Sequence, residues 1–156
     1  MKPSPATTAP ARRRPATAWW LSLGLTLVGL GVSIYLTWVK LTDNLAACGP
    51  IGDCESVNSS RYAEIAGIPI ALLGALAYVA VLALLGAERW LPRQAENLNF
   101  GVFGIGLIGT LYSAYLTYIE VAVLRAVCPY CVVSAVAVTA IFIISIARMR
   151  AADGAA

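Results

Sequence analysis

Four long stretches without a charged residue constrain the fold of this chain more than any other feature. They cover residues 15–39, 65–87, 97–119 and 126–147, and all eleven basic and eight acidic side chains lie outside them. Each stretch exceeds the roughly 20 apolar residues that cross a bilayer core as an α-helix. Four soluble core helices of this kind would leave almost no polar surface for water, since 60% of the chain is hydrophobic and 12% is charged. The pattern predicts an all-α membrane protein.

We therefore expect a bundle of four transmembrane helices in one membrane domain, residues 18–148. The expected helices cover about residues 18–39, 66–87, 97–120 and 128–147. Residues 1–17, rich in Pro, Ala and Thr, are expected to form a disordered tail, and residues 149–156 a second, short tail. In the loop after the first helix, Ser59 or Ser60 is placed to cap a short helix within residues 56–66, lying flat on the bundle.

The basic residues predict the orientation of the bundle, because Lys and Arg in short loops favour the cytoplasmic side. With the N-terminus inside, Lys40, Arg61 and Arg125 are the three basic residues on the outer face. The eight on the cytoplasmic side are Lys2, Arg12, Arg13, Arg14, Arg89, Arg93, Arg148 and Arg150. Both termini are then cytoplasmic and all four cysteines face outward, where disulfides persist in bacteria. We expect a multi-pass protein of the bacterial cytoplasmic (inner) membrane.

Two of the cysteines open the last predicted helix, in Cys128-Pro129-Tyr130-Cys131. At a helix N-terminus the unpaired backbone N–H groups and the helix dipole stabilise a thiolate on Cys128, and Arg125 could add to this effect. A structural staple across so few residues would constrain the unfolded chain little. We therefore favour a redox pair over a structural disulfide or two buried apolar thiols.

The other two cysteines, Cys48 and Cys54, enclose a glycine-containing segment of the first outer loop. Alone, such a pair is as readily a structural disulfide as a reactive one. Because a second cysteine pair is expected on the same face, the loop pair is better explained as a mobile redox pair that collects electrons from a partner and passes them to the pair at the helix start. A structural zinc site is disfavoured by the wide Cys-x5-Cys spacing and by the absence of histidine from the sequence. We expect no metal and no nucleic-acid partner.

A disulfide generator must be reoxidised, and a bilayer offers quinone as a lipid-soluble electron acceptor. The sequence has neither histidine to ligate haem nor a nucleotide-binding glycine motif. The third predicted helix contains four glycines, which either allow close helix packing or leave room for a ligand. Near its outer end, Tyr112, Tyr115 and Tyr118 either mark the membrane interface or border a quinone ring. The sequence leaves both choices open.

These residues together resemble the bacterial homologues of vitamin K epoxide reductase. The resemblance covers nearly all of the chain after its tail. Its most specific parts are the loop cysteines in Cys-x5-Cys spacing, the following Ser-Ser-Arg-Tyr at 59–62, and Ser-Ala-Tyr-Leu-Thr-Tyr at 113–118 leading into the Cys-Pro-Tyr-Cys motif.

The resemblance implies a four-helix bundle around a quinone of the menaquinone or ubiquinone type. It implies that Cys48 exchanges with a thioredoxin-fold (DsbA-like) partner, that Cys54 passes electrons to Cys128, and that Cys131 lies nearest the quinone. It also places Ser60 and Leu116 at the quinone pocket, where we add Tyr112 as a candidate. The alternative of another class is a non-enzymatic membrane scaffold with two structural disulfides.

Two features differ from the vertebrate enzymes of this family, which have an asparagine in the second helix and a tyrosine four residues after the CxxC pair. The second helix predicted here has no asparagine, and the later position is Ala135. The resemblance therefore does not imply reduction of vitamin K epoxide. Many bacterial relatives carry a fused thioredoxin-like domain, whereas we expect the partner here to be a separate protein.

Overall fold

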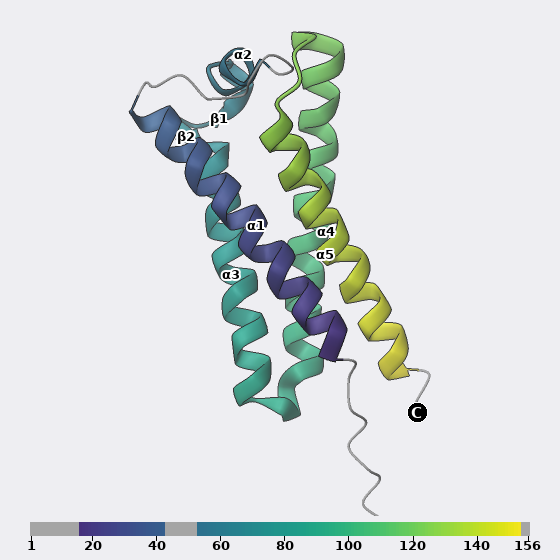
Figure 1. The fold of residues 1–156 in the computed structure, drawn as a ribbon. Coiled ribbons are helices and arrows are strands. Elements are labelled where there is room, and N and C mark those ends of the chain that lie inside the picture. The colour runs from purple at the N-terminus through teal and green to yellow at the C-terminus, as the bar shows by residue number, and fades with distance from the viewer. Residues whose placement is uncertain (1–15, 43–52, 154–156) are drawn as a thin grey trace, which may run out of the picture.

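The computed structural model describes residues 16–42 and 53–153. Its long helices are α1 (Ala16–Leu41), α3 (Ile70–Trp90), α4 (Ala95–Tyr118) and α5 (Pro129–Asp153). They form one bundle, in which α1 and α4 each pack against both α3 and α5 (Figure 1). Within the described residues, four helical segments are long and apolar enough to cross a membrane, which confirms the predicted four-helix class.

Each long helix turns large apolar side chains away from the bundle. Trp38 is 66% exposed, Leu76 59%, Ile108 71% and Ile143 58%, one on each helix. A protein surrounded by water rarely exposes so much contiguous apolar surface. In a bilayer, lipid tails cover such faces, and the helices satisfy their own backbone hydrogen bonds.

The middle of the bundle is held by Tyr78 of α3, which contacts two other helices. A Cβ atom at Gly29 of α1 would stand 2.1 Å from Cζ of this ring, so only glycine lets α1 approach so closely. The Tyr78 hydroxyl donates a hydrogen bond to the carbonyl oxygen of Ser134 in α5, at 2.9 Å. The buried cluster around the ring contains Val81, Leu85, Val102 and Ile141.

A short helix is present in the loop before α3, but not over residues 56–66 as expected. It is α2 (Cys54–Asn58), and Asp53 rather than Ser59 or Ser60 caps it. The Asp53 carboxylate accepts hydrogen bonds from the backbone N–H of Ser56 at 3.0 Å and from its hydroxyl at 2.6 Å. These two bonds hold the pKa of Asp53 below its ordinary value.

After α2 the chain forms a 3₁₀ turn and a small hairpin instead of the expected α-helix. The turn covers Arg61–Ala63. The hairpin pairs β1 (Glu64–Ile65) antiparallel with β2 (Ile68–Pro69). Its two turn residues, Ala66 (φ 52°) and Gly67 (φ 80°), adopt the positive φ values of a tight hairpin turn. The following helix therefore begins at Ile70, not at residue 66.

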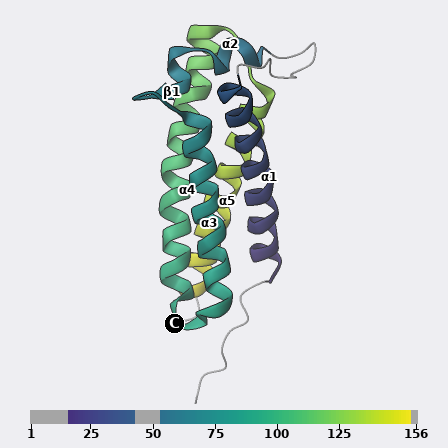
Figure 2. The same cartoon turned by 90° about the vertical axis from the view of Figure 1, so that its left-hand side faces the viewer.

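This loop covers one end of the bundle, opposite the end that carries the C-terminus (Figure 2). Lys40 at the end of α1 anchors it by donating a hydrogen bond to the carbonyl oxygen of Asn58 at 2.8 Å. The same ammonium pairs with Glu64 at 3.0 Å. The connection from α4 to α5 lies at this end too, so loop and connection share one face of the fold.

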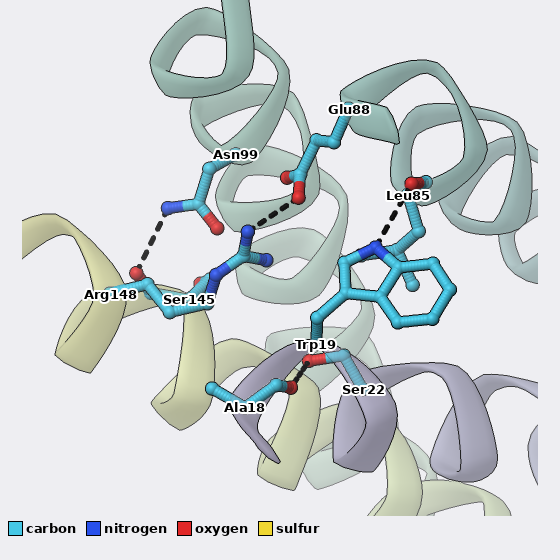
Figure 3. A network of polar contacts seen from close by, with 8 residues as sticks. All are labelled: Ala18, Trp19, Ser22, Leu85, Glu88, Asn99, Ser145 and Arg148. Atoms are coloured by element: carbon cyan, nitrogen blue, oxygen red, sulfur yellow. Dashed lines mark hydrogen bonds and ion pairs between the residues drawn. The ribbon is translucent and has the colours of Figure 1, made fainter. Parts of the chain in front are cut away.

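The opposite end of the bundle holds a network of buried polar side chains (Figure 3). Arg148 of α5 donates a hydrogen bond to Glu88 of α3, and the two side chains are only 5% and 6% exposed. Asn99 of α4 donates to the carbonyl oxygen of Ser145 at 3.1 Å, and Trp19 of α1 donates to that of Leu85 at 3.0 Å. These contacts connect all four long helices. The last helix, α5, continues to Asp153, whereas the sequence predicted its end near residue 147.

Candidate functional site

The Cys-x-x-Cys motif lies at the start of α5, where the sequence predicted it. Cys128 precedes the helix directly and is 1% exposed, and its carbonyl oxygen accepts the backbone N–H of Val132 at 3.1 Å. Pro129 occupies the first helical position, where a missing N–H costs no hydrogen bond. Both thiols of the motif are free.

Contacts with Cys131 make Cys128 the more acidic thiol of the pair. The single thiol proton of Cys131 lies within hydrogen-bonding reach of both the Cys128 sulfur and the Glu120 carboxylate, and the Cys131 backbone N–H donates a hydrogen bond to the Cys128 sulfur at 3.4 Å. These bonds hold the pKa of Cys128 below its ordinary value, against burial and the negative charge of Glu120. The exposed Arg125, which the sequence suggested as a further stabilising charge, is not among the groups that lower this pKa. Cys128 is thus suited to react as a thiolate.

The loop cysteine Cys54 lies against this motif. It begins α2, is 1% exposed and is disulfide-bonded. Cys54 and Cys128 belong to one buried cluster with Leu36 of α1. The residues preceding the two cysteines are also joined, because the Asp53 N–H donates to the carbonyl oxygen of Val127 at 3.2 Å. Cys48, the predicted outer member of the loop pair, lies outside the described residues.

A cavity of about 470 Å³ opens beside Cys131 and extends between the helices. The loop and all four long helices contribute to its walls, which are mostly apolar. Ser60, Tyr112 and Leu116, the predicted quinone contacts, all line it. Tyr115 and Tyr118 are instead 49% and 64% exposed, as expected of residues at a membrane interface.

The glycines of α4 serve both roles that the sequence left open. A Cβ atom at Gly106 would lie 3.1 Å from the backbone Cα of Phe142, and one at Gly109 would lie 2.7 Å from Val138. They allow α4 and α5 to pack closely. Both also line the cavity, where a side chain would take up space.

The volume and lining of the cavity suit a quinone. Small-molecule sites typically enclose about 300–1,000 Å³, with apolar walls and a few polar groups. Here Ser60 and Tyr112 contribute two hydroxyl-bearing side chains to a lining that is mostly apolar and that also includes Cys131. A quinone ring has the same character, an apolar body with two carbonyl oxygens.

Glu120 is a site residue that the sequence reasoning missed. It lies in the π-helical segment Ile119–Leu124 that follows α4, and it is 4% exposed. Its carboxylate accepts the backbone N–H of Cys128 at 3.1 Å and the thiol of Cys131. The available signal is an acidic residue eight positions before Cys128, at the end of the third predicted helix.

The connection after Glu120 holds it in place. The carbonyl oxygen of Glu120 accepts the backbone N–H of Ala126 at 3.1 Å and that of Arg125. Arg125 adopts a left-handed conformation (φ 50°, ψ 32°), which a residue with a Cβ atom rarely adopts. This turn reverses the chain from α4 to α5 and so brings the carboxylate to the two thiols.

Comparison with known proteins agrees with the resemblance seen in the motifs. The sequence model of the vitamin K epoxide reductase family matches residues 20–146. The match runs from the first turns of α1 almost to the end of α5 and includes all four cysteines.

Proposed function

Because this chain belongs to the vitamin K epoxide reductase family, and is thus a multi-pass membrane oxidoreductase, we propose that it generates disulfides at the expense of quinone. In this proposal a thioredoxin-fold partner donates two electrons to Cys48 and Cys54, and Cys128 and Cys131 pass them on. The observation that carries the proposal is that a cysteine of the loop pair contacts the Cys-x-x-Cys pair beside one apolar cavity. Cys54 and Cys128 share a buried cluster, and Cys131 lines the cavity.

The transfer from the partner begins with thiol–disulfide exchange at the loop pair. A partner thiolate attacks Cys48, which breaks its bond to Cys54, and the second partner thiol then releases Cys48 as the partner disulfide forms. The loop pair is left as a dithiol. Two electrons have moved, and no other reactant is consumed.

The second exchange takes place inside the protein. The Cys54 thiolate attacks the sulfur of Cys128 in the oxidised Cys128–Cys131 pair, and Cys131 leaves as a thiolate. Cys48 then attacks Cys54, which frees Cys128 and restores the loop disulfide. The low pKa of Cys128 suits this step, because a thiolate of low pKa leaves more readily.

A quinone in the cavity supplies the final two-electron acceptor. Ser60, Tyr112 and Leu116 are the residues that we propose to hold it next to Cys131, since all of them line the same space. The proposal also places the cysteine-bearing end of the bundle on the outer side of the bacterial cytoplasmic membrane, with both termini inside. Eight of the eleven basic residues then lie on the cytoplasmic side.

The proposal is tested by following quinone absorbance with purified protein in detergent and a reduced thioredoxin-fold protein as donor. Turnover is expected with the wild type and should be lost in Cys131→Ala. Val136→Ala is the matched control, because this side chain is 62% exposed on the same helix. A membrane scaffold with structural disulfides would give no turnover with ubiquinone or menaquinone, and that result would refute the proposal.

The order of the relay is tested separately. With Cys54→Ala, the free Cys48 thiolate should attack the disulfide of an oxidised thioredoxin-fold partner, in the reverse of the first exchange, and release one partner thiol. The resulting mixed disulfide of Cys48 with the partner should be visible on non-reducing gels and by mass spectrometry. Failure to trap this adduct, while quinone turnover persists, would show that electrons enter by another route.

A further inference from the structure

Glu120 is a buried carboxylate without a described cationic partner. Among the residues that the structure places, the acidic side chains in ion pairs are Glu64, with Lys40, and Glu88, with Arg148. The Glu120 carboxylate instead accepts hydrogen bonds from the Cys128 N–H and the Cys131 thiol. A buried ionised group without a counter-charge is costly, and such groups gather where protons are transferred.

The position of Glu120 also gives it access to the reacting atoms. Glu120 and Cys131 both line the apolar cavity, and the hydrogen bond from the thiol to the carboxylate is direct. A proton can therefore pass between them without an intervening group. The candidate general base is already within hydrogen-bond reach of the proton that it would take.

We propose that Glu120 is a catalytic residue that exchanges a proton with Cys131 in each turnover. This inference rests on the proposed function, because it assigns a proton path to the inner cysteine pair. When a thiolate attacks Cys128 and the bond to Cys131 breaks, the electron pair goes to the Cys131 sulfur, which takes the proton of the Glu120 carboxyl. When the pair is reoxidised, two electrons leave for the acceptor, and the Cys131 proton returns to the carboxylate.

A purely positional role for Glu120 is the rival explanation. In that role the carboxylate only holds the backbone of Cys128 through the 3.1 Å hydrogen bond. The two roles separate in Glu120→Gln, because the amide oxygen can still accept that N–H while the amide cannot take a proton at neutral pH. Glu120→Ala removes both functions.

The experiment measures reduction of the oxidised Cys128–Cys131 pair by dithiothreitol without quinone, by acid quenching, alkylation and mass spectrometry. Glu120→Gln should slow this step on the order of 10²-fold, the lower range for loss of a general acid or base. The wild type should show a solvent deuterium isotope effect on this step, and Glu120→Gln should remove it. Glu96→Gln is the control, because Glu96 is an exposed acid in the first turn of the same helix, α4.

Each outcome decides between the roles. A wild-type rate in Glu120→Gln together with a slow Glu120→Ala would overturn the proton transfer and leave the positional role. Equal rates in all variants would refute both. If the wild type never reduces quinone, the proposed function fails. The dithiothreitol reaction still tests Glu120, since it requires no quinone.

Discussion

The buried pair of Glu88 and Arg148 allows a sharp test of what holds the bundle together at the end away from the cysteines. Replacing Glu88 with Ala leaves the Arg148 guanidinium buried without its carboxylate. The guanidinium already has one nitrogen, Nη1, without a described hydrogen-bond partner. In the variant the positive charge of Arg148 would therefore be uncompensated and nearly inaccessible to water, since this side chain is 5% exposed.

The exposures of the two described ion pairs determine the expected magnitudes. Removing one partner of a buried pair costs about 3–5 kcal/mol, because the remaining charge is uncompensated. The ion pair of Lys40 and Glu64, with side chains 19% and 41% exposed, should contribute only about 0–1 kcal/mol. The difference of about 2–5 kcal/mol means that Glu88→Ala should shift the unfolding equilibrium about 30- to 4,000-fold more than Glu64→Ala, at about 1.4 kcal/mol for each factor of ten.

The assay is reversible unfolding in mixed detergent micelles, followed by far-UV circular dichroism for the wild type, Glu88→Ala and Glu64→Ala. A double variant, Glu88→Leu with Arg148→Met, should recover most of the lost stability, because replacing both charges by apolar side chains is often neutral. The reasoning would be refuted if Glu88→Ala and Glu64→Ala were equally mild, or if the double variant were less stable than Glu88→Ala.

Three further predictions concern the cysteine end and the helix contacts. Because the thiolate is the reactive form and the pKa of Cys128 is lowered, alkylation of Cys128 should reach half its maximal rate at a lower pH than an ordinary cysteine. Cys131→Ala removes the principal hydrogen bond, so this midpoint should rise; an unchanged midpoint would contradict the assigned cause. Leu116→Trp should partly fill the cavity and raise the KM for quinone roughly tenfold, about 1.4 kcal/mol of binding, while exchange with the partner proceeds at the wild-type rate. Gly29→Val drives a side chain into the ring of Tyr78 and should destabilise the bundle by about 1–3 kcal/mol in the same unfolding assay, whereas a neutral result would show that α1 can move aside.

The four helices were predictable because charged residues cannot remain unpaired in a bilayer, and each uncharged stretch is long enough to span one. The ends of the helices were less predictable. The last helix runs past residue 147, because Arg148 finds a buried partner in Glu88, sixty positions away along the chain. In the loop, the sequence offered Asp53, Ser59 and Ser60 as possible helix caps, and in the structure Asp53 caps α2.

The sequence predicted part of the candidate site, but not its full composition. The spacing of Cys128 and Cys131 at a helix start predicts a redox pair, and the resemblance pointed to Ser60 and Leu116; the structure places Cys131, Ser60 and Leu116 on one cavity. Glu120 belongs to no sequence motif that would have identified it. Its importance depends on a π-helical segment and a left-handed Arg125, which bend the chain until the carboxylate meets the thiols.

The sequence by itself determined which segments enter the membrane and which thiols can form a pair at a helix start. Both follow from local properties, namely hydrophobic length and the chemistry of neighbouring residues. Only the tertiary structure decided that Cys54 lies against Cys128, that Glu120 reaches Cys131, and that a cavity opens beside them. These relations join residues whose proximity depends on how four helices pack and how two short connections fold over one end of the bundle.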